Sequence, residues 1–418
     1  EGAPRLGSAP RACAQGRAPS AAVGPMAPPP ALAAPALRRL LASALLAGFA
    51  SGRGDPECWG GGLTGDFCCD TKKGQTGDIQ CWDGDYTFER CCGASVPVQR
   101  SPLSTRPGVA SYDVAQLLVA PSSVPGLQLL GGGSMPIAGI GMCCRPGANG
   151  DAARQAVLDY LLMGGRHIDD ATVYKNHAQV GEGIRQAVAA GVPRSDIFLT
   201  TKINPPHFGF ETATDWVARS LQELGLEYID LVLLHWAAVP TDGRACKDPK
   251  QCRQETWLAL QRAKAKRQIR HLGVSNFGER QISELLALGG APVEANQIEY
   301  HPWVPELHLQ TAEFCHRHGI VVTAYGSMGS AGSAAQMVTQ DELQEMGRAH
   351  GKTGGQVLLR WAVQRNVSVI PGTSNPNHMS ENLRIFDFSL NAQDMAMLDS
   401  IPSDQRFLHF DHWPDKAE

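Results

Sequence analysis

The feature that most constrains the fold is a regular alternation of β-rich runs and helical stretches from about residue 126 to residue 418. Eight runs are predicted to form strands: Gly139–Cys144, His167–Ala171, Ile197–Ile203, Tyr228–His235, Ile269–Asn276, Ala295–His301, Gly319–Ser327 and Val367–Ser374. Helical stretches separate them: Ala152–Met163, Gln179–Ala190, Asp215–Leu224, Gln254–Lys266, Glu279–Leu288, Leu307–His318 and Gln340–Gln364. Eight such units over about 290 residues predict an α/β protein, a (β/α)8 TIM barrel.

The alternative is a doubly wound open sheet that binds a dinucleotide. Such a sheet is expected to carry a GxGxxG motif that opens the helix after its first strand. The segment GIGMCC stands at that place and lacks the third glycine. The barrel is therefore the favoured fold.

Four polar side chains follow neighbouring strands at the end where barrel active sites form. Asp169 and Tyr174 follow the second predicted strand, Lys202 ends the third and His235 ends the fourth. These residue types suit carbonyl reduction, in which a nicotinamide cofactor supplies the hydride. Tyr174 would donate the proton, Lys202 is expected to lower the tyrosine pKa from about 10, and Asp169 would orient Lys202. His235 would donate a hydrogen bond to the substrate oxygen.

Several segments carry a family resemblance. GGRHIDDATVY, IFLTTKI, YIDLVLLHW, HLGVSNF, NQIEYHP and ENLRIFDF resemble successive signatures of the aldo-keto reductases. LQLLGGGSMPIAGIG resembles the hairpin that closes the bottom of that barrel. The resemblance runs from residue 126 to the end and implies an NAD(P)H-dependent enzyme that reduces aldehydes or ketones to alcohols. It implies that Asp169, Tyr174, Lys202 and His235 form the catalytic tetrad.

The resemblance also implies a set of cofactor contacts. Ser275, Asn276 and Gln297 would bind the carboxamide, Tyr325 would stack on the nicotinamide, and Glu381 and Asn382 would lie near the adenine. Family members that prefer NADPH usually read IPKS followed by an arginine, whereas this chain reads IPGTSNPNHMSENL. Gly372 and His378 replace the two cations, and Thr373 and His378 compensate only in part. We expect NADPH as the family cofactor, with weakened discrimination against NADH.

Apolar and aromatic side chains are expected to line the substrate pocket. The candidates are Met142, Trp236, Trp303 and Trp413, and such a lining suits a small carbonyl compound with a hydrophobic substituent. The alternative is that these residues belong to the core. No metal is expected in the site.

Charge and hydropathy exclude other classes. The 41 acidic and 37 basic residues give a net charge of −4, which argues against a nucleic-acid partner. No run of about 18 apolar residues occurs, so no stable membrane span is expected. We expect a monomer. Two other functions stay open: a non-catalytic nucleotide sensor on the same barrel, and an extracellular binding protein whose cysteine-rich module supplies the function.

The first 125 residues have a different texture. Residues 1–57 form a leader, predicted to be disordered, in which Arg38 and Arg39 precede an apolar run, Leu40–Ala50, as in a secretory signal peptide. The alternative is a disordered Ala/Pro-rich tail. A signal peptide predicts the secretory route, with an algal plastid as a destination that offers reduced cofactor. A leader that does not function would leave the chain in the cytoplasm.

A duplicated module occupies residues 58–92. CWGGGLTGDFCC and CWDGDYTFERCC share their Cys, Trp, Gly, Thr and Cys-Cys positions and hold six of the 12 cysteines. Each copy is too short to bury a core, which predicts disulfide cross-links. A zinc site is the weaker alternative because adjacent cysteines do not follow zinc-ligand spacing. The module resembles small cysteine-rich modules of algal and protist secretory proteins, and residues 93–125 read as a linker to the barrel.

Overall fold

The computed structural model describes residues 117–143, 148–237, 248–329, 338 and 340–401. All of them belong to the second of two compact units, which spans Arg53–Glu418. The predicted leader, the cysteine-rich module and most of the linker lie outside the described residues, as does Trp413.

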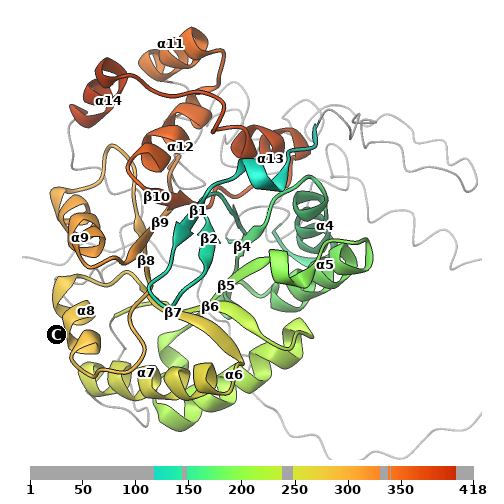
Figure 1. Ribbon diagram of the computed structural model, residues 1–418, viewed down its shortest axis with the longest axis vertical. Helices are drawn as coiled ribbons and strands as arrows, with labels where there is room; N and C mark the ends of the chain where they lie inside the picture. The colour runs from blue at the N-terminus through green and yellow to red at the C-terminus, as the bar shows by residue number, and fades with distance from the viewer. Residues whose placement is uncertain (1–116, 144–147, 238–247, 330–337, 339, 402–418) are drawn as a thin grey trace, which may run out of the picture. The chain divides into compact units, whose positions relative to one another are not determined.

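Eight parallel strands form one curled sheet in chain order (Figure 1). They are β3 (Ile140–Gly141), β4 (His167–Asp169), β5 (Phe198–Ile203), β6 (Ile229–Leu234), β7 (Ile269–Ser275), β8 (Ala295–Glu299), β9 (Val321–Tyr325) and β10 (Val367–Val369). The first and last strands meet, because the Gly139 amide donates to the Val369 carbonyl at 2.8 Å and the Val369 amide to the Ile137 carbonyl at 2.8 Å. The predicted closed barrel is confirmed.

Helices surround the sheet (Figure 1). They are α4 (Gly150–Leu162), α5 (His177–Ala189), α6 (Phe210–Leu224), α7 (Pro249–Ala265), α8 (Glu279–Leu286), α9 (Glu306–Arg317), α11 (Asp341–His350), α12 (Gly354–Gln364), α13 (Pro376–Leu383) and α14 (Ala392–Asp399). Helix α6 shows why they pack there: Ala213, Trp216, Val217 and Leu224 recur at helical spacing and are buried against the barrel.

The prediction of one helix over Gln340–Gln364 was wrong. Gly351 takes a left-handed conformation at φ +66° and ends α11, and Thr353 caps a new helix by accepting a hydrogen bond from the Gln356 amide at 3.2 Å. The helical spacing of apolar residues continues across Gly351, because α11 and α12 each bury one face.

A hairpin covers the bottom of the barrel. Strands β1 (Gly126–Gln128) and β2 (Ser134–Pro136) pair antiparallel, as predicted, and bury Leu127 and Met135. These side chains join a cluster with residues from the barrel strands. Its turn is held by Glu294, whose carboxylate accepts from the Gly131 amide at 2.8 Å. The bottom is closed, so a ligand must enter at the other end.

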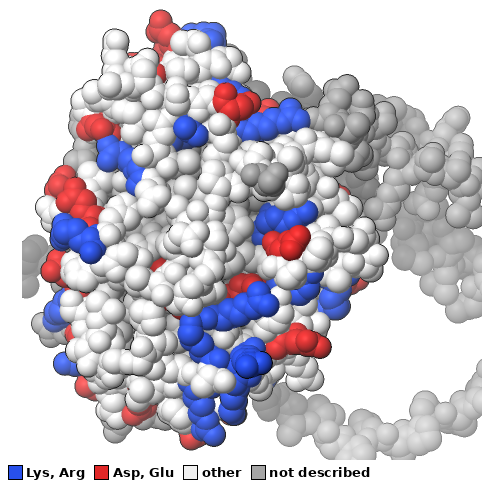
Figure 2. Space-filling view, in the orientation of Figure 1, with Lys and Arg blue, Asp and Glu red and all other residues white. Residues whose placement is uncertain are grey.

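The hairpin side of the molecule carries mixed charge. Figure 2 shows Lys and Arg gathered in its lower part. The segment Arg262–Arg270, which leads into β7, holds five cations. Buried carboxylates pair with two of them: Lys264 with Glu294 at 2.8 Å and Arg270 with Asp230 at 3.3 Å. These cations lie at the opposite end of the strands from the residues predicted for catalysis. Within the described part of the chain no helix is long and apolar enough to cross a membrane.

Candidate active site

Three of the four predicted catalytic side chains meet at one ammonium group. Lys202 Nζ lies 2.5 Å from Asp169 Oδ1 and 3.2 Å from Tyr174 Oη. Its third partner is the Asp170 carbonyl oxygen at 3.0 Å. An ammonium has three donors, so these contacts use all of them.

The strands set this arrangement. Asp169 is the last residue of β4 and Lys202 lies in the neighbouring strand β5, so both side chains reach the carboxyl end of the sheet. Lys202 has no exposed surface, and Asp169 is 2% exposed. A charge at such depth requires a charged or hydrogen-bonding partner, which each supplies to the other. Tyr174 ends the 3-10 turn Thr172–Tyr174 and is half-buried at the mouth.

His235 completes the set from the next strand. It follows β6, is 8% exposed, and its ring lies 5.9 Å from the Tyr174 ring in an edge-to-face arrangement. Burial and the positive charge of Lys202 lower the pKa of His235 well below its ordinary value of 6.5. The imidazole is therefore neutral near pH 7 and carries one N–H that can donate to a substrate oxygen.

Lys202 acts to lower the Tyr174 pKa, as expected, but the net shift is a rise. Loss of hydration on burial raises the pKa of Tyr174 above 10.0, and the opposing effect of Lys202 is smaller. Burial also opposes the charge on Lys202, but Asp169 and Tyr174 outweigh it and raise the pKa of Lys202. Near neutral pH the site therefore holds a protonated Tyr174 phenol beside a charged Lys202 ammonium. In this state the phenol can donate its proton.

The residues predicted to hold the nicotinamide lie together beside the tetrad. Tyr325 Oη donates to Asn276 Oδ1 at 2.7 Å, and Asn276 Nδ2 donates to the His235 carbonyl oxygen at 3.0 Å. Asn276 adopts φ +60°, a conformation that asparagine tolerates better than most residues. Ser275 Oγ donates to the Gln297 carbonyl oxygen at 3.0 Å.

Gln297 links this group to the tetrad, because its side-chain amide donates to Asp169 Oδ2 at 2.6 Å. Its partner is 128 positions away in sequence, so sequence reasoning assigned Gln297 only to the cofactor. The clustered amides and hydroxyls can match the donor and acceptor of a carboxamide. These residues therefore fit the nicotinamide end of a dinucleotide.

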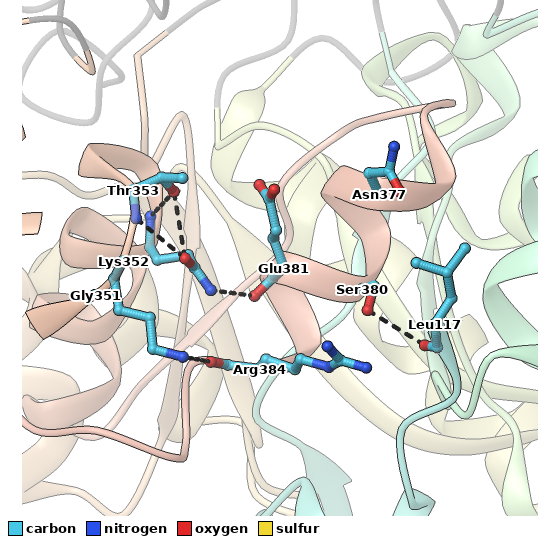
Figure 3. A pocket seen from close by; sticks show the side chains of 9 residues that line it. Leu117, Gly351, Lys352, Thr353, Asn377, Ser380, Glu381 and Arg384 are labelled. Atoms are coloured by element: carbon cyan, nitrogen blue, oxygen red, sulfur yellow. Dashed lines mark hydrogen bonds between the residues drawn. The ribbon is translucent and has the colours of Figure 1, made fainter. Parts of the chain in front are cut away.

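The predicted adenine and phosphate contacts lie on and before α13. Thr373 Oγ1 accepts from the Asn375 amide at 3.0 Å, while Gly372 and His378 are exposed. Glu381 and Asn382 are half-buried on the same helix. Glu381 lines a groove of about 600 Å³, and Figure 3 shows how its side chain lies there. The groove is lined by Leu117, Gly351, Lys352, Thr353, Gln356, Asn377, Ser380, Glu381 and Arg384, so it does not include the tetrad.

The predicted substrate residues differ in their placement. Trp236 is half-buried and stacks on the His235 ring with centroids 6.0 Å apart. Met142 is fully buried and Trp303 is 4% exposed beside His301. The described residues thus put Trp236 next to the chemistry, while Met142 and Trp303 pack in the barrel wall.

One feature near Tyr174 was not predicted. Asp170 pairs with His177, and the pair lies at the two ends of the loop that carries Tyr174. The acidic residue after Asp169 and the histidine after Asn176 were the signal in HIDDATVYKNH, but their contact depends on how the loop turns back onto α5.

The barrel and the Asp–Lys–Tyr–His set at its mouth define an oxidoreductase of the (β/α)8 class. Residues 138–402 match the model of the Aldo/keto reductase family, and the chain belongs to this family. It is 34% identical over 297 residues to aldo-keto reductase family 1 member A1 of Mus musculus, covering 66% of this chain and 89% of that protein. It is 35% identical over 291 residues to morphine 6-dehydrogenase of Pseudomonas putida, covering 68% and 93%.

Solved structures agree with this assignment. A Bombyx mori aldo-keto reductase in complex with NADP matches with a TM-score of 0.63 at 31% identity, covering 70% of this chain and 97% of that one. An aldose reductase of Schistosoma japonicum matches with the same TM-score at 28% identity, covering 70% and 99%. The chain is an aldo-keto reductase.

Proposed function

We propose that the chain reduces aldehydes or ketones to alcohols with Tyr174 as the proton donor. The observation that carries the proposal is the contact of Lys202 with both Tyr174 and Asp169 inside the barrel mouth. A reduced nicotinamide supplies the hydride when bound, and Ser275, Asn276, Gln297 and Tyr325 would hold it. The Bombyx relative was solved with NADP, which supports NADP(H) here.

The four side chains divide the remaining work. Neutral His235 donates a hydrogen bond to the carbonyl oxygen and favours negative charge on it. Tyr174, protonated near neutral pH, gives its proton to that oxygen and becomes a phenolate. Lys202 stabilises the phenolate across 3.2 Å, and Asp169 keeps Lys202 charged and aimed.

The test compares two tyrosines. Tyr174→Phe removes the proposed acid and should lower kcat for a generic aromatic aldehyde by at least about a hundredfold, with little change in NADPH affinity. Tyr160→Phe is the control, because Tyr160 is a buried tyrosine outside the tetrad that donates to the Ala138 carbonyl at 3.3 Å. Turnover retained in Tyr174→Phe would refute the assignment. Turnover absent from the parental chain would favour a nucleotide sensor.

We further propose weak discrimination between NADPH and NADH. Gly372 and His378 replace a lysine and an arginine that usually bind the 2′-phosphate in the family, and both positions are exposed in this chain. Gly372→Lys with His378→Arg should raise the NADPH preference at least tenfold, about 1.4 kcal/mol. A parental NADPH preference above about a thousandfold, about 4 kcal/mol, would contradict the proposal.

The substrate proposal is a carbonyl compound with an apolar substituent. Trp236 supports it because its ring is half-buried beside His235. Trp236→Ala should raise KM for an aromatic aldehyde more than KM for a short polar one. An equal effect on both substrates would contradict it.

The predicted N-terminal parts belong to a separate proposal. Residues 26–57 would direct the chain into the secretory route, with an algal plastid as one destination, and residues 58–92 would be cross-linked by disulfides. A fluorescent reporter fused to residues 26–57 tests the first part. A cytoplasmic reporter would refute it. Mass change on thiol alkylation, with and without reductant, tests the second.

Deleting residues 58–92 distinguishes the remaining alternative. If the module supplies an extracellular binding function, the deletion should leave carbonyl reduction intact and abolish binding of the extracellular partner. If the activity of the barrel depends on the module, kcat for carbonyl reduction should change.

A further inference from the structure

The loop that carries Tyr174 has its two ends joined by a buried pair. Asp170 follows β4 directly, and His177 is the first residue of α5. His177 Nδ1 lies 2.5 Å from Asp170 Oδ2, and the two side chains are 3% and 0% exposed. None of the catalytic steps above uses this pair.

Asp170 also contacts the tetrad through its backbone. Successive residues of an extended strand point to opposite sides, so Asp169 faces Lys202 while the Asp170 side chain faces α5. The Asp170 carbonyl oxygen nevertheless accepts from Lys202 Nζ at 3.0 Å. One residue is thus held by His177 on one side and holds the ammonium on the other.

Two other contacts attach the loop to its neighbours. Asn176 Nδ2 donates to the carbonyl oxygens of Met142 and Ala148, at 2.8 and 2.6 Å. Trp216 Nε1 donates to Thr172 Oγ1 at 3.2 Å. These bonds tie the loop to other segments, whereas the Asp170–His177 pair joins the loop's own two ends.

We propose that Asp170 and His177 are positioning residues that hold the Tyr174 phenol within hydrogen-bond distance of the Lys202 ammonium. The inference rests on the proposed role of Tyr174 as proton donor. Loss of the pair lets the ends of the loop separate, and the phenol moves away from the ammonium. Neither side chain is among those placed at the cofactor, so cofactor binding is unaffected.

The test replaces His177 without leaving a cavity. His177→Phe keeps a ring and removes the bond, and it should lower kcat about tenfold to a hundredfold with KM for NADPH within about twofold. Because Lys202 opposes the rise of the Tyr174 pKa, the alkaline limb of the kcat profile should move to higher pH. His177→Asn restores a donor and should recover most of kcat. If the phenyl ring prevents folding, His177→Ala carries the same expectation.

A matched control separates positioning from stability. His271 and Glu294 form a similar pair at the closed end of the barrel, 2.7 Å apart, with no exposure of the carboxylate. His271→Phe should lower the unfolding temperature and leave kcat and the pH profile unchanged. A folded His177→Phe with parental kcat and parental pH profile would refute the inference alone. No turnover in the parental chain would refute the proposed function, and this inference with it.

Discussion

The ion pair of Lys202 and Asp169 can be measured by a double-mutant cycle. Lys202→Met leaves a buried carboxylate, and Asp169→Asn leaves a buried ammonium. Removing one partner of a buried pair costs about 3–5 kcal/mol. Gln297 still donates to Asp169 at 2.6 Å and the Asp170 carbonyl still accepts from Lys202, so we expect the low end, about 3 kcal/mol for each single variant. The double variant removes both charges but leaves the buried Asp170 carbonyl without its donor, so it should also cost about 3 kcal/mol.

The cycle therefore predicts a coupling free energy of about 3 kcal/mol. Urea unfolding at pH 7, followed by tryptophan fluorescence, measures the four free energies. Single-variant losses that add to within about 0.5 kcal/mol in the double variant would refute the reasoning, because they would mean that the two groups do not interact. All three variants should lose carbonyl reduction, whatever their stability.

Three further outcomes are expected. Because burial raises the Tyr174 pKa, kcat for reduction should stay flat across neutral pH and fall only above about pH 10, where the phenol ionises; a fall near pH 8 would contradict this. Burial alone would raise the Glu294 pKa, but hydrogen bonds from His271 and Lys264 outweigh it and lower the pKa. The stability that Glu294 contributes is therefore present above its ordinary pKa near 4.3 and lost as pH falls through the lower folded value. Glu294→Gln should cost about 1–3 kcal/mol at pH 7 in urea unfolding, reduce that acid-dependent loss and leave kcat unchanged. Gly351→Ala should cost about 1–2 kcal/mol in thermal unfolding, because φ is +66° there. An added Cβ would meet no other atom, so the cost would come from backbone strain, and an unchanged unfolding midpoint would exclude it.

Much of the barrel could be predicted because its signals are local. Each predicted strand overlaps an observed one, and the hairpin lies where the family resemblance placed it. The break between α11 and α12 was missed because a buried helical face continues on both sides of Gly351. Helices α13 and α14 were missed as well. Both begin at an asparagine that accepts a backbone hydrogen bond, at Asn375 and Asn391, and this capping signal was legible in the sequence.

The meeting of Asp169, Tyr174 and Lys202 could be predicted from the sequence, but the energetics of these side chains could not. Parallel strands bring their carboxyl ends together, so residues that end neighbouring strands had to meet. The direction of the Tyr174 pKa shift depends on how much water the fold removes from the phenol. The neighbouring charges alone do not determine this loss of hydration. The contact of Gln297 with Asp169 crosses the interior between residues far apart in sequence. Predicting a contact of this kind requires knowing how all the strands of the barrel are aligned with one another.

The junction of the first and last strands has a consequence for biosynthesis. Ile137 and Gly139 pair with Val369, so the ribosome must release nearly all of the barrel sequence before the junction can form. Until then the strand that contains Ile140 presents an unpaired edge, to which another nascent chain can add. A chain that terminates before residue 367 leaves this edge exposed and is expected to aggregate instead of folding into a smaller barrel.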